Sequence, residues 1–207
     1  MNSKYPEFYA DIKPITVQDP LAIELGVSAD GAMDYSFYDV AKTAGHTCPA
    51  TAGAFLLCKV ALRALYGEDL PQRGQIKISL GGERSDGFSG AVANVISLIT
   101  GATAECGFGG IFGRNCRMQL LEFKSDLPPF TAIFTRTDSN KSVKVSYSPR
   151  PALASFEGAL RLNELKGLMA SSAASKEERA EFARLWQEQV RLVFAKDLGD
   201  LVSLESF

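Results

Sequence analysis

The sequence predicts an α+β fold, in which an antiparallel or mixed sheet is packed with helices and is followed by a helical C-terminal extension. Three observations predict it. Residues 49–66 carry an unbroken helical pattern, residues 117–148 contain alternating strand patterns around a turn, and the pattern becomes helical again beyond Pro151. With 207 residues, the chain can bury a core without help from a metal or a disulfide.

The first half of the chain predicts an arm, a short helix, a buried helix, a strand and a second buried helix. Residues 1–33 mix single aromatics with prolines, which indicates an irregular arm or a short helix laid on the body. Residues 34–44 predict a short helix. Residues 49–66 (PATAGAFLLCKVALRALY) predict the clearest helix, because proline suits a first helical position and glycine follows. Residues 75–80 alternate like a strand, and the apolar residues 91–100 predict a helix.

The second half predicts a meander and then helices. Residues 117–123, 130–137 and 142–148 read as strands, the last two joined by a turn. Ser175 and Glu178 have the spacing of a helix-capping box. An amphipathic stripe follows, which is typical of a face docked on the domain or on a second copy: Phe182, Leu185, Trp186, Val190, Val193 and Phe194.

Composition excludes several classes of partner. Charged residues make up 22 % of the chain and the formal net charge is -2, so neither nucleic acid nor an anionic membrane surface is an expected partner. The N-terminus has no signal-like apolar core, and no stretch approaches 18 uninterrupted apolar residues. We therefore expect a cytoplasmic protein with reduced cysteines.

His46 and Cys48 are the first candidates for chemistry, because both lie directly before the start of the helix predicted at Pro49. A thiolate at a helix N-terminus is stabilised by unpaired N–H groups and by the helix dipole. An imidazole beside it forms a normal ligand pair for zinc. The alternatives are a satisfied turn histidine with a buried cysteine, or a Cys/His nucleophile pair.

Further ligands would have to come from elsewhere in the chain. Cys58 lies about 15 Å further along the helix and is expected in the core. Cys106 and Cys116 flank a glycine-rich segment that could fold over the helix N-termini, with Cys106 the better candidate.

The loop GGERSDGFSG, before the second buried helix, supplies three more candidates. Asp86 could cap that helix or face a metal. Glu83 and Arg84 suit an anionic or carboxylate ligand, although solvated loop charges explain them equally well.

Several known motifs are absent from the sequence. It contains no phosphate-binding G-x-x-x-x-G-K-[ST] or G-x-G-x-x-G loop and no G-x-S-x-G elbow. A single histidine also excludes a three-histidine zinc site within one chain.

The stretch GHTCPATAGAFLLCKVALRAL, with TGAT and a glycine-rich segment some fifty residues later, resembles the FmdE-like family, which takes its name from a component of formylmethanofuran dehydrogenase. The similarity spans residues 34–123, and Gly45-His46-x-Cys48-Pro49 is its sharpest element. It implies an α+β metal-binding domain, here residues 34–150, with zinc held by the His and Cys of that motif. Residues 1–33 would then be an N-terminal arm and residues 151–207 a helical extension packed on the same domain.

Three functions remain open at this point. The first is metal binding, most simply of zinc, with Asp86 or Cys106 as a third ligand and an open position for a small anionic ligand or substrate; Glu83 or Asp86 would be a candidate base, and Arg84 would hold the anion. The second is a non-catalytic module that carries haem or another porphyrin, with His46 as axial ligand, or that docks on an oxidoreductase. The third is an interaction protein that uses the Trp186 helix, and a homodimer is compatible with that face.

Overall fold

The computed structural model describes residues 4–207. Within them the elements in chain order are η1 (Glu7–Asp11, a 3-10 helix), β1 (Ile15–Gln18), α1 (Pro20–Glu24), β2 (Ala32–Tyr35), α2 (Phe37–Ala44), α3 (Pro49–Tyr66), β3 (Ile76–Gly81), α4 (Ser89–Thr100), β4 (Leu121–Lys124), β5 (Thr131–Arg136), β6 (Ser142–Tyr147), α5 (Arg150–Leu153), α6 (Ala159–Ala170), α7 (Lys176–Ala195), α8 (Leu198–Leu201) and β7 (Val202–Ser206). The fold is α+β, as predicted.

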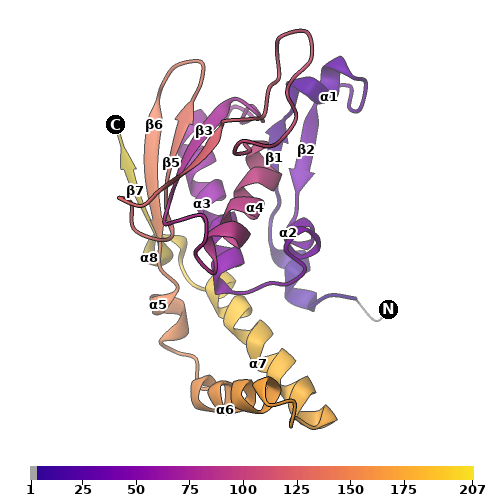
Figure 1. Cartoon of the computed structure of the whole chain (residues 1–207), viewed down its shortest axis with the longest axis vertical. Helices are drawn as coiled ribbons and strands as arrows, with labels where there is room; N and C mark the ends of the chain where they lie inside the picture. Colours follow the sequence, from indigo (N-terminus) through magenta and orange to yellow (C-terminus); the bar gives the residue numbers. More distant parts are fainter. Residues whose placement is uncertain (1–3) are drawn as a thin grey trace.

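The main sheet is mixed and is covered by helices on one face. Its strand order is β4-β3-β5-β6-β7, with β3 and β4 parallel and the other neighbours antiparallel. Helices α3 and α4 pack on the same face of this sheet (Figure 1). Along β3 the side chains of Ile76, Ile78 and Leu80 are buried, whereas Lys77 is exposed on the open face. The period-two alternation of the sequence therefore sets which side of the sheet faces the helices.

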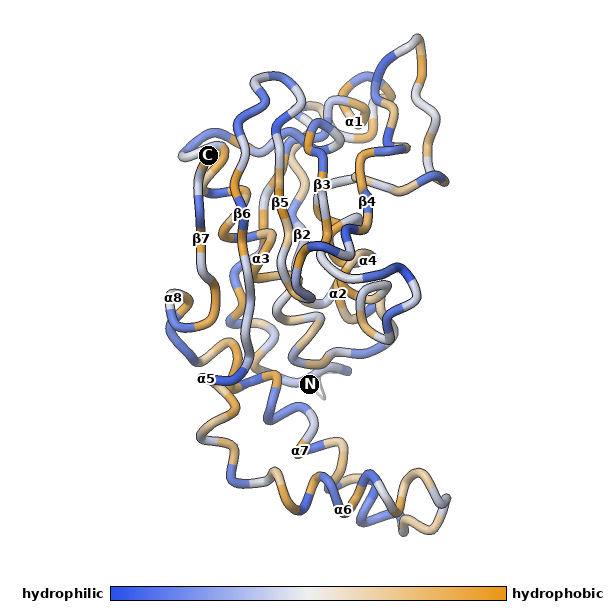
Figure 2. Tube along the Cα trace, turned by 60° about the vertical axis from the view of Figure 1, so that its left-hand side comes forward, coloured by the Kyte–Doolittle hydropathy of each residue, from blue (hydrophilic) through white to orange (hydrophobic). Residues whose placement is uncertain are grey.

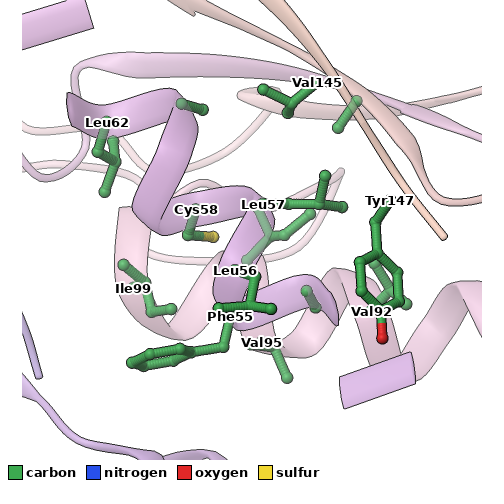
Figure 3. Close-up of a cluster of buried hydrophobic side chains, with 14 of the residues drawn as sticks. Phe55, Leu56, Leu57, Cys58, Leu62, Val92, Val95, Ile99, Val145 and Tyr147 are labelled. Carbon is green, nitrogen blue, oxygen red and sulfur yellow. The ribbon is translucent and has the colours of Figure 1, made fainter. Parts of the chain in front are cut away.

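Helix α3 is the centre of the core. Pro49 occupies its first position and Gly67, with φ of 63°, ends it, so the bounds predicted from the sequence are confirmed. The Cys58 side chain lies among apolar neighbours (Figure 3), and its burial raises the pKa of the thiol. The expectation that Cys58 is a core residue is confirmed.

Helices α3 and α4 begin at the same end of the sheet. Tyr147, the last residue of β6, donates its hydroxyl hydrogen to the Pro49 carbonyl oxygen at 2.9 Å. Its ring contacts Phe130, just before β5, and Phe130 stacks on Phe88, just before α4, with ring centroids 5.5 Å apart. These contacts hold the first turns of α3 and α4 at the same end of the sheet.

The N-terminal segment contains two short helices, η1 and α1, in line with the short-helix alternative, and also a strand pair that the sequence did not predict. Strand β1 pairs antiparallel with β2, and Tyr9, Ile15 and Val17 are buried. A division at residue 33 falls inside β2, so residues 1–33 do not end at a structural boundary. The helix expected over residues 34–44 begins only at Phe37, where Ser36 and Asp39 form a capping box.

The C-terminal extension packs on the body along α7. Ser175 and Glu178 form the predicted capping box, and Val190 and Val193 are buried in the main core. The first turns of α7 and all of α6 project from the body, as Figures 1 and 2 both show, and they share a smaller apolar cluster with Phe156. The amphipathic stripe of α7 thus packs against other parts of the same chain.

The helical C-terminal extension is confirmed by α5 to α8, but its last residues form β7, a strand that the sequence did not predict and that pairs with β6. One expectation about the second half was wrong. The strand expected over residues 117–123 begins only at Leu121, and Arg117 is instead a buried partner of Asp19. Within residues 4–207, no helix has both the length and the apolar character needed to cross a membrane.

Candidate functional site

The turn between α2 and α3 presents His46 and Cys48. Gly45 ends α2 with φ of 70°, a left-handed conformation that glycine adopts without a steric penalty. Cys48 is the residue that precedes the first helical position of α3, with φ of -153°. Cys48 therefore occupies the N-cap position of α3.

The Cys48 side chain is half-buried at the N-terminus of α3. Its backbone N–H donates to the Thr51 hydroxyl oxygen at 3.0 Å, and that oxygen lies 3.8 Å from the Cys48 sulfur. The sulfur thus sits beside polar groups at the positive end of an 18-residue helix. Nearby, burial raises the pKa of Tyr147, with a smaller contribution from Cys48.

The His46 side chain is exposed and held by its own turn. Its Nδ1 lies 3.0 Å from the carbonyl oxygen of Ala44. A carbonyl oxygen only accepts hydrogen bonds, so Nδ1 carries the proton in this contact. With Nδ1 carrying this proton, Nε2 is the nitrogen that would offer a lone pair to a metal.

Thr47, between these two residues, fixes the turn to the rest of the molecule. Its hydroxyl lies 2.5 Å from the Tyr9 hydroxyl and also accepts a hydrogen bond from the Gln187 side-chain amide at 3.1 Å. Its carbonyl oxygen accepts a hydrogen bond from the Trp186 indole at 2.7 Å. Thr47 is buried, whereas His46 is exposed, so the turn is anchored through its middle residue and leaves the imidazole outside.

The remaining candidates have other partners or lie exposed. The Asp86 carboxylate accepts the Glu83 backbone N–H at 2.8 Å and lies 3.4 Å from the Ser89 hydroxyl, so it stabilises the loop before α4. Arg84 forms an ion pair with Glu105 at the surface. Glu83 is exposed, as are Cys106 and Cys116. Among residues 4–207, no group of three or more His, Cys, Asp and Glu side chains is arranged to hold a metal ion.

The polar residues that hold the turn were missed by reasoning from the sequence. Tyr9 and Gln187 carry no motif, and their contacts with Thr47 cross 38 and 140 positions of the chain. The one available signal was the position of Thr47 itself, a polar residue between two candidate ligands.

No protein-family model matches the sequence, and a comparison with curated proteins found no match either.

Proposed function

We propose that this protein binds a borderline transition-metal ion, most simply zinc, at the turn before α3, with the Cys48 thiolate and the His46 Nε2 as its protein ligands. The single observation that carries the proposal is the state of His46. Its Nδ1–H donates to a backbone carbonyl, which is the arrangement that orients a metal-ligating histidine and frees its other nitrogen.

The positions of the two ligands suit one ion. His46 and Cys48 are two residues apart, so their Cα atoms are separated by at most about 7.6 Å, within the span of two ligands of one zinc ion. The Cys48 sulfur is half-buried beside the first turn of α3, so a metal ion bound to it would lie at the start of that helix. Thiolate and imidazole together suit zinc better than magnesium or calcium, which prefer oxygen ligands.

Two protein ligands leave about two positions of a tetrahedral ion open. Water, a small anionic ligand or a side chain of another protein would fill them, since Asp86 is engaged within its own loop. The resemblance to FmdE-like proteins agrees with this site, but the residues of this chain carry the proposal.

The test is a zinc titration of the apo protein against a chromophoric chelator, with elemental analysis of untagged protein. The wild-type chain should bind one zinc ion, and His46→Ala and Cys48→Ser should each weaken binding at least about tenfold. Cys116→Ser removes an exposed thiol outside the turn and should bind like the wild type. Cobalt should also give a thiolate charge-transfer band that is lost in Cys48→Ser.

Two results would overturn the proposal. One is equal zinc affinity of the wild type and both turn variants, and the other is zinc lost only with Cys116→Ser. An absorption spectrum of the same samples tests the porphyrin alternative, which predicts a Soret band that disappears in His46→Ala. The exposed His46 side chain gives no particular support to that alternative.

A further inference from the structure

A pocket of about 620 Å³ opens between η1, α3 and the end of α7, away from the turn that carries His46. Leu56 and Lys59 of α3 line it, and α7 contributes Arg191, Val193, Phe194 and Ala195. Its size falls within the range of pockets that hold small organic molecules.

The aromatic residues in the wall of this pocket are held in place by packing. Phe194 packs edge-on against Phe37, with ring centroids 4.7 Å apart, and lies 6.2 Å from Phe55. Phe8 of η1 packs against Tyr9, whose hydroxyl is fixed by its contact with the buried Thr47. A ligand therefore meets rings that are fixed from behind, so little conformational entropy is lost when it binds.

The charged residues that line the pocket leave an excess of positive charge. Arg191 is bound to Glu188 through two hydrogen bonds of 2.8 and 2.6 Å, and Lys196 is paired with Asp200. Lys13 and Lys59 also line the pocket, and neither has a hydrogen-bond or ion-pair partner within residues 4–207.

Asp11 is the one carboxylate in the lining. Set against the two unpaired lysines, it leaves one positive charge uncompensated.

From these observations we propose that the pocket binds a small organic monoanion with an apolar body, such as a medium-chain or aromatic carboxylate. The apolar body lies against Phe8, Leu56 and Phe194, and the anionic group lies at the edge, where Lys13 and Lys59 supply the positive charge. The apolar contact supplies most of the affinity, and the lysines select an anion over a neutral or cationic analogue of the same shape. This site is separate from the proposed metal site and does not depend on it.

The first probe is 8-anilinonaphthalene-1-sulfonate, an aromatic anion whose fluorescence rises in apolar surroundings. Displacement by octanoate, octanol and octylamine then separates charge from shape, because the three share one apolar chain. We expect octanoate to displace the dye at least about tenfold better than octanol, with octylamine weakest, as an ionic contact of about 1.4 kcal/mol predicts.

Variants assign the binding to this pocket. Lys59→Met removes the charge but keeps the chain length, and it should weaken octanoate binding about three- to tenfold while leaving octanol unchanged. Lys77→Met, on the open face of the sheet, is the matched control and should bind octanoate like the wild type. Ala195→Trp, at an exposed position in the lining, should fill the pocket and reduce binding of both ligands.

The proposal is overturned if octanol displaces the dye as well as octanoate does. It is also overturned if Lys59→Met binds octanoate like Lys77→Met, or if neither the dye nor octanoate binds at all. Should Ala195→Trp fail to fold, the two lysine variants still decide the matter.

Discussion

The indole Nε1–H of Trp186 donates a hydrogen bond of 2.7 Å to the backbone carbonyl of Thr47, across 139 positions of the chain. This contact joins the middle of α7 to the turn that presents His46 and Cys48. Gln187, the next residue of α7, bonds the hydroxyl of the same threonine. The amphipathic stripe of α7 therefore does more than cover the core. Trp186, which belongs to the stripe, and its neighbour Gln187 also hold the turn of the candidate site in place.

Replacing Trp186 with phenylalanine should weaken both the fold and the site. The change removes the donor and leaves the Thr47 carbonyl without this partner, which costs about 1–3 kcal/mol in the free energy of unfolding. Zinc affinity should fall as well, since the turn loses one of its anchors. Urea denaturation and the chelator titration measure the two effects. Leu160→Ala is the control, because Leu160 is 84 % exposed and its truncation should change neither.

Gly53→Ala should destabilise the protein although alanine is the better helix former. A Cβ on Gly53 would lie 2.2 Å from a ring carbon of Tyr147, so either α3 or the ring must move. Overpacking of this kind costs about 1–3 kcal/mol and should outweigh the roughly 1 kcal/mol gained in helix propensity. Thermal and urea unfolding provide the measurement.

Gly167→Ala in α6 is the matched control for that change. A Cβ at Gly167 meets nothing within 4 Å, so only the propensity gain remains and stability should rise by about 0.5–1 kcal/mol. Equal effects of the two glycine variants would contradict the close packing of Tyr147 on α3.

The elements that the sequence predicted well are those with local signals. Helix α3 was bounded correctly because Pro49 and Gly67 act on their own turns, and the start of α7 was located because Ser175 and Glu178 cap each other. By contrast, β7 forms only by pairing with β6, some sixty residues earlier, so its own residues gave no distinct pattern. A strand of this kind is decided by its partner.

The candidate site could be predicted only in part for the same reason. The position of Cys48 at a helix start follows from its neighbour Pro49 and was foreseen. The anchoring of Thr47 depends on partners that are remote in sequence, and the hydrogen bond of Asp86 to the Glu83 backbone within its own loop was not foreseen. Arg117 was placed in a strand because its neighbours alternate, whereas its charge is paired with Asp19, 98 positions away.

The four thiols should differ sharply in reactivity with an alkylating reagent. Cys106 and Cys116 are exposed and should react first, and the half-buried Cys48 should react more slowly. Cys58 should react only when the protein unfolds, because burial both blocks access and raises the pKa of its thiol. Mass spectrometry of labelled peptides gives the order, and Cys106→Ser with Cys116→Ser should abolish the fast phase. Labelling of Cys58 at the rate of Cys106 would contradict the position of Cys58 in the core.

Asp19 should link the stability of the fold to pH. Arg117 donates to its Oδ1 at 2.6 Å and Arg73 to its Oδ2 at 2.8 Å, and the Asp19 carboxylate is buried. Burial by itself raises the pKa of Asp19, but the hydrogen bond from Arg73 and the charges of both arginines more than offset it, so the pKa lies below its usual value.

A carboxyl with a lowered pKa in the folded state stabilises the fold above its unfolded pKa of about 3.9, and this contribution is lost as the pH falls through the folded pKa. Asp19→Asn leaves two buried or half-buried guanidinium groups without their carboxylate and should cost about 3–5 kcal/mol at pH 7. The difference between wild type and variant should shrink below pH 4, because protonation then removes the same charge from the wild type. Glu68→Gln, at an exposed ion pair with Arg63, should change stability little at either pH. A difference for Asp19→Asn that stays constant between pH 7 and pH 2.5 would show that the cluster stabilises the fold by packing rather than by charge.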